Sequence, residues 1–325
     1  MTATGVRYLR DPLSRFNLHL LSETLRPHLP TCRFPDFLCL PPRKSDLVSG
    51  GYVPERVRIP KSWHFLYFPS TSDENSLYAD GYDPVPTRIL LNGQSRRRWR
   101  GGEIVFGSGD LVCEEPGKCV LTEEVTVEGD QCRWTRVDEI TVRRMANSTE
   151  TEVSVDYSIV ETRHLVYLPN KATKEKIADH SGRARAIKLA NLTPLFQTIL
   201  TPTRALVFRF SALTFNAHRI HYDPVYATTI ERLPDVIVQG TLSLVLIMSW
   251  IQFDPQVYSA LGISYADVPK KIKRVRYSCV QNVIVDKEIK MGIAPFPAAI
   301  VGEQKWRIWI EQDGGICLKG TITVG

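Results

Sequence analysis

The chain lacks the motifs of the commonest nucleotide-binding and hydrolytic sites. Its 325 residues contain no Walker loop, no GxGxxG turn, no HExxH helix and no GxSxG elbow. There is also no repeat at the periods that solenoid proteins use. P-loop, dinucleotide, zinc-protease and serine-hydrolase chemistries are therefore unsupported by the sequence.

Cysteines are few and are not spaced like metal ligands. The seven cysteines are scattered along the chain and form no CxxC pair, so the sequence predicts neither a structural zinc site nor a disulfide framework. Such a pattern fits a reducing compartment, where a cysteine is most simply a small buried hydrophobe. We expect no metal and no cofactor.

Hydrophobic runs long enough for a bilayer are also missing. The most apolar window, VIVQGTLSLVLIMSWI at 236–251, is shorter than the about 20 residues that a membrane span needs. From Leu242 to Ile251 it has no polar face, which predicts a helix that is covered on all sides. We expect no membrane span.

The N-terminus has no secretory pattern, because no long apolar core precedes a small-residue cleavage site. Instead Arg7, Arg10 and Arg15 alternate with leucine and phenylalanine. This is either a weak mitochondrial transit signal or the first helix of the fold. We expect a mitochondrial or cytoplasmic location.

The charge balance is mildly basic, with a formal net charge of +6, which gives no case for nucleic acid. Two basic clusters, RRRWR at 96–100 and KKIKRVR at 270–276, are candidates for binding the phosphates of coenzyme A or of a carrier-protein pantetheine. In the second cluster, Arg274 and Arg276 are the residues that we expect to contact the substrate. Their alternation with Val275 equally predicts a half-exposed strand.

Strand patterns dominate from Glu103 onward, and 43% apolar content is enough to bury a core. Alternating segments separated by turn signals predict an antiparallel sheet, which would wrap around the buried helix at 236–251. A polar and basic segment at 169–194 interrupts the pattern and predicts a connection between two halves. The strands that we expect lie at 120–127, 132–142, 151–168, 205–212, 271–285, 306–312 and 316–324.

Stretches of sequence in both halves resemble a known family. LVFRFSALTFNAHRIHYDPVYA at 206–227 precedes the apolar run, and WHFLYF at 63–68 and RRRWRGGEIVF at 96–106 lie in the first half. Together they resemble the type 2 hydroxyacyl-thioester dehydratase and mesaconyl-CoA hydratase family, a double-hot-dog branch of the MaoC-like superfamily. The resemblance covers about residues 60–325. It implies an α+β double hot-dog fold, with two curved antiparallel sheets each wrapped around a central helix.

The resemblance also implies a division of labour. We expect an N-terminal hot-dog domain at 1–168 that shapes the substrate tunnel, a linker at 169–190, and a MaoC-like domain at 191–325 that carries the active site. One site per chain is expected, at the interface between the halves. The expected partner is an acyl-CoA or acyl-carrier-protein thioester, and homodimerisation is left open.

The resemblance implies three catalytic positions. His221 matches the family histidine, on a loop expected to leave the sheet, and imidazole suits a general base near neutral pH. Asn216 stands five residues earlier, where the wider superfamily has aspartate; an amide can orient water or a hydroxyl but cannot exchange protons like a carboxylate. Gly240, which begins the apolar run, would let the thioester carbonyl approach the helix N-terminus.

Further residues are expected to contact the substrate. Gln239 stands where the family usually has histidine, and His218 and Arg219 lie between the catalytic positions. Because Asn216 cannot carry a proton, either one histidine serves both proton transfers or His218 or a water assists. Purely structural roles are the alternative: a satisfied histidine at 221, a turn-capping asparagine and a tight helix start.

Three functions are compatible with these residues and with the resemblance. The first is a (3R)-hydroxyacyl-thioester dehydratase, as in mitochondrial fatty-acid synthesis. The second is a hydratase or dehydratase of a specialised acyl or polyketide pathway, which the departures at Gln239 and at 281–286 favour. The third is a non-catalytic acyl-binding protein of the same fold, against which the intact NAHRIHYD run argues.

Overall fold

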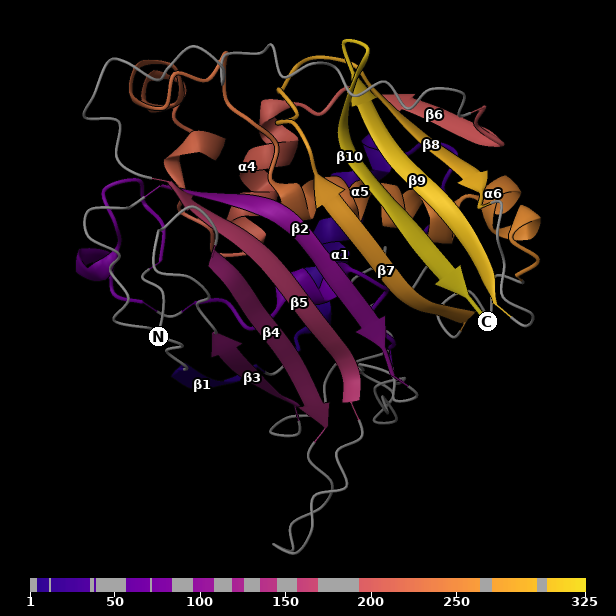
Figure 1. Ribbon diagram of the computed structural model, residues 1–325, viewed down its shortest axis with the longest axis horizontal. Helices are drawn as coiled ribbons and strands as arrows, with labels where there is room; N and C mark the ends of the chain where they lie inside the picture. Colours follow the sequence, from indigo (N-terminus) through magenta and orange to yellow (C-terminus); the bar gives the residue numbers. More distant parts are fainter. Residues whose placement is uncertain are drawn as a thin grey trace, which may run out of the picture.

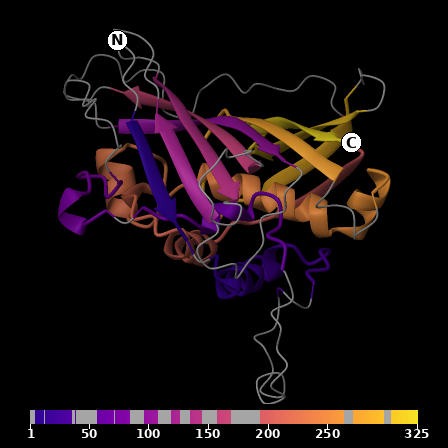
Figure 2. The same ribbon diagram turned by 90° about the horizontal axis from the view of Figure 1, so that it is seen from below.

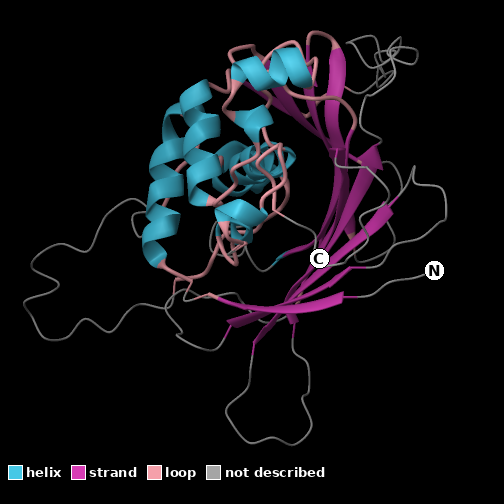
Figure 3. Ribbon diagram, turned by 90° about the vertical axis from the view of Figure 1, so that its left-hand side faces the viewer, coloured by secondary structure: helices cyan, strands magenta, loops and turns pink. Residues whose placement is uncertain are grey.

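One antiparallel sheet forms one side of the molecule, and helices cover its concave face (Figures 1 and 3). The predicted linker at 169–190 and Lys270 lie outside the described residues. The computed structural model describes residues 5–11, 13–35, 38, 57–70, 72–83, 96–107, 119–125, 135–144, 157–168, 193–263, 271–296 and 303–325.

The sheet has ten strands within the described residues, in the order β1-β3-β4-β5-β2-β7-β10-β9-β8-β6. Each pairing is antiparallel. The strands are β1 (Gly5–Arg10), β2 (Arg96–Phe106), β3 (Cys119–Val125), β4 (Thr135–Arg144), β5 (Tyr157–Leu168), β6 (Phe196–Leu200), β7 (Ile272–Cys279), β8 (Ile289–Pro295), β9 (Gln304–Gln312) and β10 (Gly315–Val324).

The two halves of the sheet repeat one strand order. In each half the first strand is followed across the sheet by the third, fourth, fifth and second, giving β1-β3-β4-β5-β2 and β6-β8-β9-β10-β7. The halves meet where β2 pairs with β7, from Gly101 opposite Ser278 to Val105 opposite Arg274. Backbone hydrogen bonds therefore run across the boundary, and the two halves form one continuous surface.

The helices lie on one side of this sheet, as the edge-on view in Figure 2 also shows. Among the described residues, the α-helices are α1 (Arg15–Leu25), α4 (Arg204–Leu213), α5 (Gly240–Phe253) and α6 (Pro255–Ala260). Shorter 3-10 turns are η1 (Arg26–His28), η2 (Trp63–Leu66), η3 (Glu74–Ser76) and η5 (Arg219–His221), and η6 (Tyr226–Ile230) is a π-helical turn.

Helix α5 is the buried helix that the sequence predicts. Every residue from Leu242 to Phe253 is buried, so the uniformly apolar sequence is matched by protein on all sides. Polar groups near its C-terminal end find partners in the first half of the chain. Trp63 donates its indole N–H to Ser249 Oγ at 2.8 Å, and the Gln252 amide exchanges hydrogen bonds with the backbone of Lys61.

The prediction of a strand at 205–212 is wrong, because this segment forms helix α4. Thr203 caps it by accepting the backbone N–H of Leu206 at 3.2 Å. Leu206, Val207 and Phe210 are buried at helical spacing, whereas Phe208 is 61% exposed. The candidate catalytic loop therefore leaves a helix and not the sheet.

At the N-terminus, residues 5–10 form a strand and residues 15–25 form α1. The interpretation as a first helix thus holds from Arg15 onward. Ser14 caps this helix by accepting the backbone N–H of Phe16. Among the residues that the structure describes, none of the helices combines the length and apolarity needed to cross a membrane.

Candidate active site

His221 lies in the short turn η5 and is 8% exposed. Its Nδ1 is 2.8 Å from the carbonyl oxygen of Ile237. Since a carbonyl only accepts, Nδ1 carries the proton and Nε2 keeps its lone pair. Burial, helped by the charge of His218, lowers the pKa of His221 to about 3. The imidazole is therefore neutral near neutral pH, as a general base must be.

His218 stands beside His221 and is also buried. The two rings meet edge to face, with centroids 5.4 Å apart. His218 Nε2 is 3.4 Å from Oδ2 of Asp80, a buried carboxylate of the first half. The ring of Tyr82, from the same segment as Asp80, stands edge-on to His218 at 5.4 Å. The first half of the chain therefore completes the surroundings of the candidate catalytic loop.

Asn216 caps the turn that leads to the two histidines. Its Oδ1 accepts the backbone N–H of His218 at 3.0 Å, and its own backbone N–H donates to the carbonyl oxygen of Ser211 at 2.8 Å. This is the turn-capping geometry that the sequence left open as an alternative. A role in orienting water stays a prediction.

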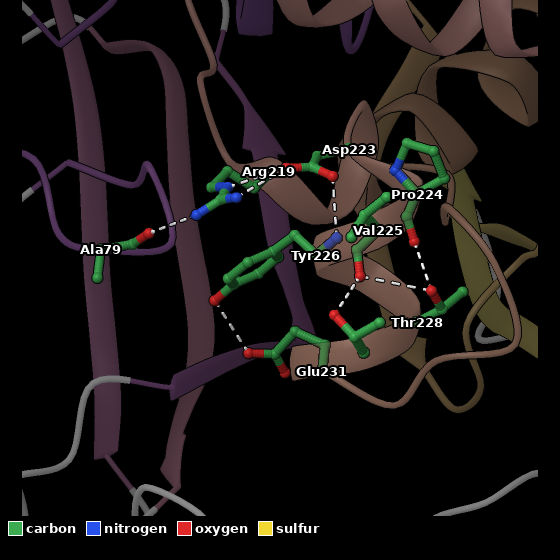
Figure 4. A network of polar contacts seen from close by, with 9 residues as sticks. Ala79, Arg219, Asp223, Pro224, Val225, Tyr226, Thr228 and Glu231 are labelled. Carbon is green, nitrogen blue, oxygen red and sulfur yellow. Dashed lines mark hydrogen bonds and ion pairs between the residues drawn. The ribbon is translucent and has the colours of Figure 1, made fainter.

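Arg219 holds the candidate catalytic loop together and connects it to the first half (Figure 4). Its guanidinium donates to Asp223 at 2.8 and 3.1 Å, reaches the Ala79 carbonyl at 3.5 Å, and stacks over the Tyr226 ring at 4.3 Å. Tyr226 in turn donates to Glu231 at 3.2 Å. These contacts give Arg219 a structural role, and its predicted contact with substrate stays a prediction.

The loop and the first half also approach through their backbones. The backbone N–H of Arg219 donates to the carbonyl oxygen of Asp80 at 2.8 Å. Gly81 has φ +81°, and a Cβ there would lie 2.2 Å from the carbonyl oxygen of Ala217. Because no side chain fits at this distance, glycine is what allows the two segments to touch.

Gly240 begins α5 in a narrow space between the helix and the β2–β7 seam, where the two halves of the sheet pair. A Cβ at this position would lie 3.3 Å from Cys279 Sγ and 3.6 Å from Trp99 Cγ. Gln239 precedes it as the N-cap residue but makes no side-chain cap. The start of α5 therefore keeps backbone N–H groups for another acceptor, and Ile237, the partner of His221, is three residues away.

Gln239 connects the start of α5 to α4. Its Nε2 donates to the carbonyl oxygen of Val207 at 3.0 Å and to Ser211 Oγ at 2.7 Å. Its Oε1 is buried and has no hydrogen-bond partner among the described residues. Ser211 thus contacts both Gln239 and, through its carbonyl oxygen, Asn216.

Trp99 on β2 faces Gly240 and forms one wall of the space at the start of α5. The sequence did not single it out as a site residue. A bulge between Trp99 and Gly101 lies in the β2–β5 pairing, and Trp99 donates its indole N–H to Tyr277 on β7 at 3.1 Å. The Arg163 guanidinium stacks on the Trp99 ring at 5.0 Å. The wall is therefore built from both halves.

Arg163 is itself held by a buried carboxylate. Glu161, which is fully buried, accepts two hydrogen bonds from Arg163 at 2.8 and 2.9 Å and lies 3.2 Å from His64 Nε2. Burial alone would raise the pKa of Glu161, but the charge of Arg163 and the contact with His64 outweigh it and lower the pKa to about 2. This network holds the Arg163 guanidinium in place against the Trp99 ring.

Arg274 and Arg276 are not brought together with His221. Val275 and Tyr277 are buried against the helix side of β7, so the two arginines between and beside them point to the opposite face. Both pair with Glu103 on β2, Arg276 at 2.7 Å. The half-exposed strand alternative is confirmed by the burial pattern of β7, and binding of phosphates stays a prediction.

Comparisons with known proteins identify the family. The family model described as hydroxyacyl-thioester dehydratase type 2 matches residues 62–285. The chain belongs to this family. A type 2 hydroxyacyl-thioester dehydratase from Schizosaccharomyces pombe, named as mitochondrial, is 26% identical over 310 residues, covering 88% of this chain and 89% of that protein.

One further relative and one solved structure are also similar to this chain, and the solved structure bears on the fold alone. A mesaconyl-C(4)-CoA hydratase from Chloroflexus aurantiacus is 29% identical over 193 residues, covering 58% of this chain and 63% of that protein. A solved structure named MaoC-like dehydratase aligns with a TM-score of 0.60 at 13% identity, covering 98% of this chain and 97% of that one. The predicted hot-dog fold is confirmed, with the two expected sheets joined into one through β2 and β7.

In the part of this type 2 dehydratase family member that the structure describes, no cluster of three or more histidine, cysteine, aspartate or glutamate side chains is arranged to hold a metal ion. Cys32, Cys279 and Cys317 carry free thiols, and burial raises the pKa of Cys279 and of Cys317 to about 12. Both thiols are therefore protonated near neutral pH and behave as small apolar groups.

Proposed function

We propose that the protein catalyses the reversible dehydration of a (3R)-3-hydroxyacyl thioester to a trans-2-enoyl thioester. The observation that carries this proposal is the neutral, buried His221, with Nδ1 fixed by Ile237 and its lone pair on Nε2, beside the start of α5. A fixed neutral imidazole is a competent acceptor for the α-proton of a thioester.

Removal of the α-proton places negative charge on the thioester oxygen. The uncapped start of α5 at Gly240 supplies backbone N–H groups for that oxygen in a site of low dielectric. Trp99 and Cys279 close the other side of the space at Gly240. We infer that the thioester group binds here, with the β-hydroxyl directed toward the loop of Asn216 and His218.

The substrate class follows from the family and its relatives. The S. pombe and C. aurantiacus relatives are named for a hydroxyacyl thioester and a CoA thioester, which supports an acyl-CoA or acyl-carrier-protein substrate. The first of these is named mitochondrial. We therefore include a mitochondrial location, with a role in fatty-acid synthesis, in the proposal.

A second candidate is a hydratase of a specialised acyl pathway. Gln239 favours it, because its buried Oε1 has no partner among the described residues and lies at the head of α5. Such an oxygen accepts a hydrogen bond from a polar acyl group more readily than it contacts a plain alkyl chain. The reaction would be the same and the acyl group different.

The test is mass spectrometry of the purified protein with a panel of enoyl and 3-hydroxyacyl thioesters, some with polar acyl groups. We expect water to be added to or removed from at least one pair. His221→Ala should lower turnover by about 10²-fold to 10⁴-fold, while Tyr222→Phe, at the exposed neighbouring residue, should match the wild type. A folded wild-type protein that converts no thioester would leave the non-catalytic alternative.

A further inference from the structure

We propose that His218, charged by the Asp80 carboxylate of the first half, is the general acid of this active site, so that Asp80 supplies what Asn216 lacks. This inference rests on the proposed function and adds the second proton transfer to it. His218 is the residue that would touch the leaving hydroxyl. Asp80 acts through His218 and is a positioning residue.

Asp80 and His218 bring two distant segments of the chain into contact. Both residues are buried, with Oδ2 and Nε2 3.4 Å apart. Asp80 Oδ1 also accepts the backbone N–H of Tyr82 at 3.0 Å, which fixes the carboxylate. The backbone contacts at Arg219 and Gly81 hold the two segments at this distance. The pair is therefore a fixed part of the fold.

The two histidines have different surroundings. A carboxylate beside an imidazole favours the protonated imidazolium, and His218 has Asp80 at that position. His221 instead donates Nδ1–H to a neutral carbonyl and forms no ion pair with a carboxylate of the described residues, so burial keeps it uncharged. Environments that separate two titratable groups in this way assign one as acid and the other as base.

The proposed reaction balances in protons and electrons. His221 Nε2 takes the α-proton, the electron pair of the C–H bond forms the new double bond, and the C–O bond to the β-hydroxyl breaks. His218 gives its proton to the departing oxygen, so that water leaves and no hydroxide is formed. His221 ends with one proton more and His218 with one fewer. Transfer of a proton between the adjacent imidazoles, or through water, restores the starting state.

Other groups near His218 fit this role less well. Asn216 is an amide whose oxygen caps the turn at His218. Arg219 is occupied by Asp223 and Tyr226, and a guanidinium does not give up its proton in proteins. Tyr82 presents its ring to the ring of His218.

The experiment separates proton donation from simple positioning by changing the leaving group. Elimination from a 3-hydroxyacyl thioester is compared with elimination from the matching 3-chloroacyl thioester, because chloride departs without a proton. Asp80→Asn keeps the turn to Tyr82 but removes the charge, and His218→Gln keeps a donor for Asp80 but cannot transfer a proton. Asp83→Asn is the matched control, a nearby carboxylate with no ion pair among the described residues.

We expect His218→Gln to lower kcat for the hydroxy substrate by about 10²-fold or more and Asp80→Asn to lower it by at least about 10-fold. Both variants should retain the chloro reaction within about 3-fold. His221→Ala should lose both reactions, and Asp83→Asn neither. Equal losses for both leaving groups would reduce Asp80 and His218 to structural residues, and wild-type hydroxy turnover in both variants would equally overturn the proposal. Absence of any turnover by the wild type would instead contradict the proposed function.

Discussion

At the scale of single residues, one backbone contact and burial together set the protonation of His221. The carbonyl of Ile237 selects the tautomer, and burial lowers the pKa to about 3. An unfolded histidine has a pKa of about 6.5. Below that pH the His221 side chain binds a proton in the unfolded chain but not in the folded chain. The free energy of unfolding therefore falls as the pH drops from about 6.5 toward 3.

This difference predicts a pH dependence of stability. Between pH 6.5 and pH 5 the wild type should lose up to about 1.4 kcal/mol per pH unit from this residue, and His221→Ala should lose that much less. Denaturant unfolding of both proteins at the two pH values measures it. Parallel losses in the wild type and the variant would mean that His221 is accessible to protons in the folded state.

Asn216 yields a second prediction at this scale. Asn216→Asp should keep the turn, because aspartate also accepts the backbone N–H of His218. Asn216→Ala should lose about 1 kcal/mol of stability and should lower kcat by displacing His218. Unfolding curves and steady-state kinetics of the two variants test this. Wild-type values of kcat and KM in both would leave Asn216 as a turn residue without a part in catalysis.

The sequence pointed to some of these candidate residues and missed others for a physical reason. His221 and Gly240 sit in continuous motifs, so a local pattern is enough to find them. Asp80 and Trp99 lie far in the sequence from the residues that they contact. They belong to the candidate site only because the chain folds back on itself. No spacing rule connects residues that meet through tertiary structure.

At the scale of elements, the contact between the 79–82 segment and the catalytic loop depends on Gly81. Gly81→Ala should separate the two segments, because its Cβ would lie 2.2 Å from the Ala217 carbonyl oxygen. Gly314→Ala is the matched control. It also has a positive φ, of +75°, but no atom lies within 4 Å of its Cβ, so it carries the backbone strain without the collision.

We expect Gly81→Ala to lower kcat by about 10-fold or more, since small displacements of catalytic groups are costly. Gly314→Ala should retain kcat and lose only about 1 kcal/mol of stability. Thermal unfolding and thioester kinetics of both variants measure this. Equal kcat values would show that the 79–82 segment does not hold the loop in its active position.

The sequence predicted helices and strands correctly where either one face or every face of the element is buried. Helix α5 was predicted because an uninterrupted apolar run needs cover on every side. Helix α4 was mistaken for a strand because Phe208 and Phe210 alternate with Arg209 and Ser211. Strands β1, β6 and β8 were not predicted, nor was the part of β2 before Glu103. Strand β6 is a short edge strand, and the pattern of β8 does not alternate, since four consecutive residues are buried.

At the scale of the whole molecule, the second half holds His221, His218 and α5 but not their surroundings. Trp63 and Lys61 satisfy polar groups of α5, and Asp80 contacts His218. The segment 189–325 alone would expose the β7 edge and the apolar face that the first half covers. We therefore expect it to be insoluble or inactive, although it contains His221 and His218.

Expression of 189–325 alone, and together with 1–188 as a separate chain, tests this expectation. Thioester turnover should be absent in the first case and partly restored in the second, because the β2–β7 seam can reform between chains. A soluble 189–325 fragment with full turnover would show that the first half is dispensable, and would contradict a site shared between the halves.

The repeated strand order bears on how such chains diverge. When two similar units are joined in one polypeptide, each unit can lose a part that the other supplies. Among the described residues the long buried helix lies in the second unit, while the first supplies Trp63, Asp80 and Trp99 around it. A first half inherited from a distant relative would bring strands that still pair but loops that no longer meet. Recombination between lineages should therefore fail at the loops before it fails in the sheet.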